Sequence, residues 1–144
     1  MVEKQIELPE PFLNWLSTLP SEHFVTYKKT EWYFYSMAEL QEPMQVDRFV
    51  ATNATQLSAW VEFHKSLGAK SADAPKNTKF PFGRLAKCIT IASYDTDILF
   101  TDPNDAYSMW QFQQEDVDVR PLKCDLLAFI ESAKVEDLND DDDD

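Results

Sequence analysis

The stretch ILFTDPNDAYSMWQF, residues 98–112, contains two strand-like apolar segments separated by DPND. Asp and Asn favour turns because their side chains bond nearby backbone N–H groups, and proline presets φ for the second position of a turn. Similar strand-like segments, separated by short polar stretches, occupy residues 87–93, 97–101, 107–113 and 116–120. This spacing predicts a β-meander in the last third of the chain.

Helices are predicted on both sides of the meander in the sequence. Residues 8–20 begin with prolines and repeat apolar residues every three to four positions, and residues 124–133 contain Asp125, a suitable N-cap. Residues 53–68 end at a glycine and place Leu57, Trp60, Val61, His64 and Leu67 on one face of a helix. The stretch 69–83 that follows is predicted to be a loop from its composition. Residues 23–29 and 31–36 read as two short strands. Ser36 and Glu39 have capping-box spacing at the start of a short helix over 36–43. The predicted class is therefore α+β, with a mostly antiparallel sheet of about five to six strands packed by N-terminal, middle and C-terminal helices.

Length and charge indicate one acidic domain. With 144 residues, 44% of them apolar, we expect a single folded domain over 1–135 and a disordered acidic tail over 136–144. The formal charge is −13, and the seven acids of the tail leave −6 on the rest of the chain. Because phosphate contacts need Lys and Arg, this charge argues against nucleic-acid or membrane binding and favours a basic protein partner.

Targeting signals and disulfides are not expected. No apolar run approaches the roughly 20 residues of a membrane helix, and the start MVEKQIELPEPF lacks the pattern of a signal peptide. Cys88 and Cys124 are far apart and suggest no disulfide framework. A cytoplasmic location is therefore expected. No oligomeric state is predicted.

Most catalytic and metal chemistries lack their sequence patterns. The acidic stretch within residues 98–112 has neither the central Gly nor the closing Glu of a calcium loop. The two glycines of the chain are too few for a glycine-rich phosphate loop. The sequence also has no Cys or His residues at the spacing typical of a zinc site. Cys88, Cys124 and His64 stand among apolar residues and are interpreted as packing residues. We therefore predict a non-enzyme without cofactor or metal. A catalytic carboxylate pair would need burial, which sequence does not report.

Between Tyr94 and Val119 there are seven acids and no Lys or Arg. These candidate partner-binding acids are Asp95, Asp97, Asp102, Asp105, Glu115, Asp116 and Asp118. In a meander, the turn at 102–105 projects from one end of the sheet, whereas 95–97 and 115–118 project from the other. Trp32, Tyr107 and Trp110 are candidate aromatic anchors; the alternative is that they pack beneath helices.

Three stretches resemble the SUKH superfamily, the cell-wall-synthesis-regulator-like domains found widely as bacterial toxin immunity proteins. LPEPFLNWLSTLP (8–20) resembles the opening helix, EWYFYSMAEL (31–40) a strand entering a short helix, and residues 89–133 the closing strands and helix. The resemblance implies an α+β domain with a mostly antiparallel sheet. It also implies a binding function without chemistry, in which a cognate toxin, often a nuclease, is neutralised.

Three functional hypotheses follow. The first is an immunity-type inhibitor that neutralises a basic, nuclease-like toxin through an acidic surface, as in toxin–antitoxin pairs. The alternative is an intracellular regulatory or scaffold domain that binds another protein without inhibiting a toxin. The third is a small hydrolase that uses a carboxylate pair.

Overall fold

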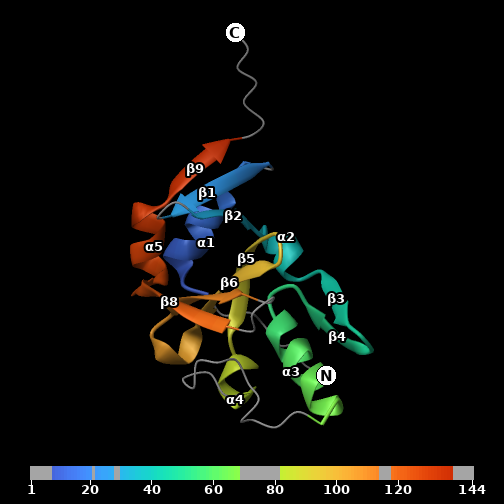
Figure 1. The fold of residues 1–144 in the computed structure, drawn as a ribbon. Helices are drawn as coiled ribbons and strands as arrows, with labels where there is room; N and C mark the ends of the chain where they lie inside the picture. The colour runs from blue at the N-terminus through green and yellow to red at the C-terminus, as the bar shows by residue number, and fades with distance from the viewer. Residues whose placement is uncertain (1–7, 21, 28–29, 69–81, 114–117, 138–144) are drawn as a thin grey trace.

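The computed structural model describes residues 8–20, 22–27, 30–68, 82–113 and 118–137. Seven strands form one antiparallel sheet, in the order β8-β7-β6-β5-β2-β1-β9, which curls into a half-barrel (Figure 1). They are β1 (His23–Tyr27), β2 (Thr30–Phe34), β5 (Ile89–Tyr94), β6 (Asp97–Asp102), β7 (Ser108–Gln113), β8 (Asp118–Asp125) and β9 (Lys134–Asp137). The predicted α+β class is confirmed, and the sheet is larger than the five to six strands expected.

A separate hairpin lies outside this sheet. It consists of β3 (Pro43–Val46) and β4 (Phe49–Thr52), which turn at Asp47, a residue with φ of 56°. Aspartate tolerates this left-handed conformation better than most residues. The hairpin was not predicted, because neither strand has a clear alternation of apolar and polar residues.

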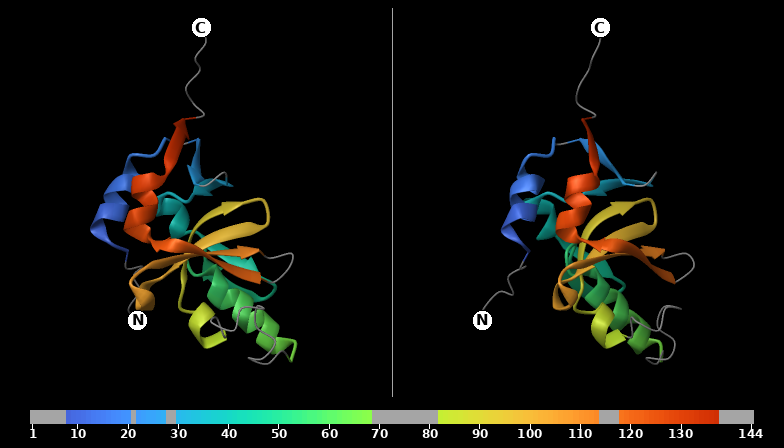
Figure 2. Two further views of the ribbon diagram at one scale, coloured as in Figure 1. Left: turned by 60° about the vertical axis from the view of Figure 1, so that its left-hand side comes forward. Right: turned by 90° about the vertical axis from the view of Figure 1, so that its left-hand side faces the viewer.

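The helices lie on two sides of the sheet. They are α1 (Glu10–Ser17), α2 (Met37–Leu40), α3 (Gln56–Ser66), α4 (Phe82–Leu85) and α5 (Leu126–Ser132). In Figure 2, α1 and α5 lie side by side, and α3 and α4 lie together at the opposite side of the molecule. The predicted N-terminal, middle and C-terminal helices thus correspond to α1, α3 and α5.

Two hydrophobic clusters result from this arrangement. Leu99 of β6 belongs to the cluster that includes Phe12 of α1 and Phe129 of α5, whereas its neighbours Ile98 and Phe100 belong to the cluster beneath α3 and α4. Side chains of a strand alternate between its two faces, so β6 is covered on both. This position explains why its sequence, DILFTD, contains an unbroken apolar run.

Local capping signals in the sequence are confirmed. Ser36 Oγ accepts from the Glu39 amide at 3.1 Å, and Glu39 Oε1 accepts from the Ser36 amide at 2.9 Å, which completes the capping box at α2. Asp125 Oδ1 accepts from the Ala128 amide at 2.8 Å at the start of α5. Each cap contributes about 1 kcal/mol in typical cases.

Two predicted boundaries and one predicted burial need correction. The predicted loop 69–83 lies outside the described residues as far as 81, and its last two residues, Phe82 and Gly83, begin α4. Glu136 and Asp137, assigned to the tail, instead form the end of β9, which pairs with β1. The remainder of the predicted tail, 138–144, lies outside the described residues. Leu67, placed on the apolar face of the middle helix, is exposed.

In the described part of the chain, no helix combines the length and apolarity required to cross a membrane.

Candidate functional site

The acids of the meander lie at two opposite ends of the sheet. Asp97 pairs with Gln113, which in turn pairs with Asp118, so these residues share one end. Asp102 pairs with Ser108 at the other end. For the five of these acids that the structure describes, the separation predicted from the sequence is confirmed, and they do not form one patch.

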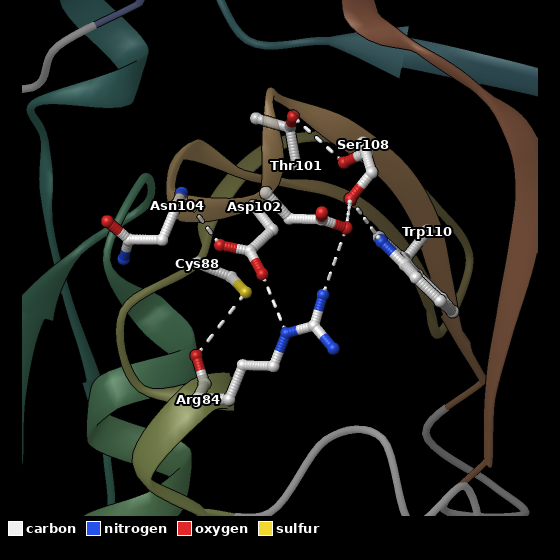
Figure 3. Close-up of polar contacts among 8 residues, drawn as sticks. Arg84, Cys88, Thr101, Asp102, Asn104, Ser108 and Trp110 are labelled. Atoms are coloured by element: carbon white, nitrogen blue, oxygen red, sulfur yellow. Dashed lines mark hydrogen bonds and ion pairs between the residues drawn. The ribbon is translucent and has the colours of Figure 1, made fainter.

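At the second of these ends, Asp102 is buried and bound to Arg84 of α4 (Figure 3). Arg84 Nε donates to Asp102 Oδ2 at 2.7 Å, and the Asn104 amide donates to Asp102 Oδ1 at 2.9 Å. The second bond is the turn interaction expected of an Asp at this position. The first is not predicted by the sequence, because Arg84 lies 18 residues away, just after the predicted loop 69–83.

Asp105 extends this network toward β7. Arg84 Nη2 donates to Asp105 Oδ2 at 3.2 Å, and Ser108 Oγ donates to the same oxygen at 2.8 Å. Trp110 Nε1 donates to Ser108 Oγ at 2.8 Å, and the Arg84 guanidinium carbon lies 5.6 Å from the centre of a Trp110 ring. One guanidinium therefore binds two carboxylates, offsets one of their two negative charges and also contacts an aromatic face.

A polar cavity of about 580 Å³ adjoins the network. Its lining residues are Gly83, Arg84, Lys87, Asp102, Asn104 and Asp105. A general acid needs a carboxyl group that holds its proton in apolar surroundings. Here Asp102 faces a guanidinium, and Asp105 is 57% exposed. The pair of buried carboxyl groups that a hydrolase would need is not formed by these two acids.

The hydroxyl of Ser108 and the thiol of Cys88 lie next to the Arg84–Asp102 network (Figure 3). Ser108 Oγ bonds Asp105 and Trp110 rather than a histidine. Burial, with a smaller contribution from the charge of Asp102, raises the pKa of the Cys88 thiol, so the thiolate that would act as nucleophile is disfavoured. His64 packs against Trp60 with ring centres 3.9 Å apart and the rings tilted by 31°, which agrees with its predicted packing role.

The opposite end of the sheet carries a second acidic group. We call Tyr94, Asp95, Asp97 and Asp118 the acidic edge. Asp95 lies exposed in the turn between β5 and β6 with φ of 58°, and Asp97 Oδ2 accepts from Gln111 Nε2 at 3.0 Å. Among the described residues, neither Asp95 nor Asp97 forms an ion pair.

Asp118 differs from its neighbours in this edge. Its Oδ2 lies 3.1 Å from Arg120 Nε, and both side chains reach solvent. Such surface pairs are weak. Glu115 and Asp116, also predicted to bind a partner, lie outside the described residues.

The predicted aromatic anchors are mostly core residues. Trp32 is 1% exposed and Trp110 is 7% exposed, so neither ring is presented on the surface of this structure as a docking anchor would be. Tyr107 is half-buried at the Arg84 end of the sheet. The alternative interpretation, in which these aromatics pack beneath helices, holds for both tryptophans because helices cover both faces of the sheet.

Tyr94, an exposed aromatic residue among the described residues, was not among the predicted anchors. Tyr94 is 46% exposed at the end of β5, and its ring centre lies 5.9 Å from that of Phe24 in β1. The sequence signal for this exposure is its position immediately before the DTD turn. Residues that flank a turn lie at the end of a sheet, beyond the helices that cover its middle.

In the described part of the chain, no group of three or more His, Cys, Asp or Glu side chains is placed to hold a metal ion.

Comparisons with models of known protein families, with curated proteins and with solved structures each found no match.

Proposed function

We propose that this protein is a non-catalytic binding domain, an immunity-type inhibitor that covers a basic, nuclease-like toxin with its acidic edge. One observation carries the proposal. Arg84 forms ion pairs with both Asp102 and Asp105, whereas Asp95 and Asp97 have no cationic partner among the described residues. Of the described acids of the meander, those without a cationic partner therefore lie at one end of the sheet.

The acidic edge has the two properties that a docking surface for a basic protein needs. Its carboxylates stand at the ends of paired strands, so their positions are fixed without a partner. Tyr94 adds an exposed aromatic ring beside them, and tyrosine is enriched among residues that dominate binding energy. Together they favour rapid, electrostatically steered association.

The resemblance to the SUKH superfamily supports the same proposal. It implies an α+β domain with a mostly antiparallel sheet, which agrees with the architecture of this chain. A regulatory or scaffold domain would use the same surface. The product of the neighbouring gene distinguishes the two: a toxic nuclease domain encoded beside this gene favours an inhibitor, and its absence favours a scaffold.

The test combines inhibition with association kinetics. The toxin domain encoded beside the gene is purified, its nuclease activity is titrated with this protein, and stopped-flow association is measured at low and physiological salt. The variant D95N/D97N removes two charges from the acidic edge. The control E10Q/E131Q removes two exposed charges from α1 and α5.

We expect the edge variant to associate about tenfold more slowly at low salt and to lose most of the salt dependence, because steering depends on local charge. The control should keep the wild-type rate within about twofold. Equal rates for the two variants would show that net charge, rather than the edge, guides association. Full nuclease activity at saturating protein would reject the inhibitor function itself.

A further inference from the structure

Strand β9 forms one end of the seven-stranded sheet and presents an open edge. Among the described strands its only neighbour is β1 (Figure 1), and Lys134, Val135 and Glu136 are all exposed. A strand at the end of a sheet directs a row of backbone N–H and C=O groups away from its neighbour, and another extended strand can pair with them. The edge of β9 is therefore a surface on which a further strand fits.

The two edges of the sheet differ in how they oppose such pairing. Strand β8, at the other end of the sheet, contains Pro121, which lacks a backbone N–H, and its register with β7 shifts between Ser108 and Trp110. Proline and bulges keep edge strands from pairing with other chains. Strand β9 has neither feature, since its sequence is KVED and its register with β1 runs without a shift. Of the two edges, β9 is the one whose backbone can accept a partner strand.

Val135 is an apolar side chain that the fold leaves partly uncovered. It lies opposite Val25 of β1, and residues directly opposite each other in a ladder project from the same face. Val25 is 0% exposed and belongs to the cluster that contains Phe12 and Phe129, whereas Val135 is 41% exposed, with no described strand beyond it. A partner strand along β9 would bury this side chain.

The sequence of β9 favours a second copy of the same chain as its partner. When two identical strands pair antiparallel about a two-fold axis, one residue lies opposite itself. A charged residue of β9 on the axis would set two identical charges face to face, which is destabilising. Val135 on the axis instead sets two apolar side chains opposite each other and puts each Lys134 opposite the Glu136 of the other copy.

We propose that this protein forms a two-fold dimer in which the β9 strands of two copies pair antiparallel, with Val135 on the axis and two Lys134–Glu136 pairs beside it. Within the described part of one chain, neither Lys134 nor Glu136 forms an ion pair, so both charges are available to the second copy. The dimer uses no residue of the acidic edge. It is therefore independent of the proposed inhibitory function.

The association is expected to be weak. Strand β9 has 4 residues, and so short a strand makes a small interface of the size found in transient contacts. The formal charge of −13 on each copy also opposes association. We expect a dissociation constant on the order of 100 μM in about 0.3 M salt, where repulsion between distant charges is largely screened.

Charge exchange across the axis tests the pairing. Sedimentation equilibrium of the full chain is measured from about 20 μM to about 1 mM in this salt. The variants K134E and E136K each set like charges opposite one another twice, so each should raise the dissociation constant about tenfold. The double variant K134E/E136K restores both pairs at the net charge of the wild type, so its dissociation constant should lie within about threefold of the wild-type value.

The single variant E136K separates this pairing from a general effect of charge. It makes the chain less acidic, which by itself would strengthen association between two copies. Association of E136K as tight as that of the wild type overturns the proposal, and so does a double variant that associates as weakly as the single ones. A wild-type chain that stays monomeric at about 1 mM also overturns it and leaves the edge to a strand of a different protein.

A second measurement tests the axis without the charge variants. In a C124A background, V135C places two thiols opposite each other, with Cβ atoms about 5 Å apart and within reach of a disulfide after a small shift. The matched control is L127C, because Leu127 of α5 is 40% exposed, close to the 41% of Val135. Oxidation with copper–phenanthroline should link V135C into dimers about tenfold faster than L127C. Equal rates overturn the two-fold pairing of β9.

Discussion

Replacing Arg84 by methionine is the most direct test of how the Asp102 end of the sheet is held. Asp102 is 2% exposed and would keep the Asn104 amide as a partner while losing the 2.7 Å bond to the guanidinium. Removing one member of a buried ion pair typically costs about 3–5 kcal/mol. The Arg84 side chain is 30% exposed, so water would reach part of the vacated space. We therefore expect a loss of about 2–4 kcal/mol in the free energy of unfolding.

The assay is urea unfolding followed by circular dichroism, supported by thermal melts. For a domain of this length, a loss of this size lowers the melting temperature by roughly 5–15 °C. The matched control is R120M, which breaks the surface pair with Asp118 and should cost less than about 1 kcal/mol. The m-value should stay unchanged if both variants keep the native fold.

A double-mutant cycle identifies the cause. In R84M/D102N the buried charge is gone, and the neutral amide can still accept from Asn104, so the double variant should be more stable than the sum of the single changes predicts by about 1–3 kcal/mol. R84K should recover only part of the lost stability. The lysine ammonium restores the positive charge, but it lacks the planar guanidinium whose separate N–H groups reach both carboxylates. The reasoning is refuted if R84M costs no more than R120M, or if D102N gives no relief in the R84M background.

Two further predictions concern α5 and the residues next to it. D125A removes the acceptor of the Ala128 amide and should lower the free energy of unfolding in urea by about 1 kcal/mol. The control E131A, at an exposed position of the same helix, should lower it by less than about 0.5 kcal/mol. Equal losses would show that Asp125 does not cap the helix. The Tyr27 hydroxyl donates to Cys124 Sγ at 3.4 Å, and this bond, followed by burial, raises the pKa of Tyr27 from 10.0 to about 12. A raised tyrosine pKa means that the folded state holds the proton more tightly, so this contribution to stability is complete below pH 10 and is lost as the pH rises toward 12. Tyrosinate absorbance and unfolding measured across this interval should show less loss in C124A, and an identical profile in C124A would contradict the assigned cause.

Features that depend on neighbouring residues could be predicted from the sequence. The capping box at Ser36, the cap at Asp125 and the turn at 102–105 each involve groups within three residues of one another. The meander followed from alternating strand and turn segments, and its register then placed the acids at two ends. In each case a short stretch contains all the atoms that make the interaction.

Features that depend on distant segments could not be predicted in the same way. Strand β9 exists because Lys134–Asp137 pairs with β1, more than 100 residues earlier, and its sequence has no strong strand propensity of its own. The burial of Trp32 has a similar origin. Alternation along β2 indicates that Trp32 and Phe34 share a face, but α1 and α5 decide that this face is covered.

The two acidic turns of the meander show how far composition can mislead about a binding surface. DPND and YDTD have similar residues and similar turn chemistry, yet Asp102 of the first is buried and compensated by Arg84, and Asp95 of the second is exposed. The difference comes from α4, which brings a cation to one end of the sheet. Acids paired with a cation add less to the field that a partner meets, because the Arg84 guanidinium offsets one of the two carboxylate charges at the Asp102 end. A formal charge of −13 therefore describes the chain poorly as an electrostatic surface. The physically relevant quantity is the uncompensated charge at each end, and for the described residues it favours the end at Tyr94–Asp97.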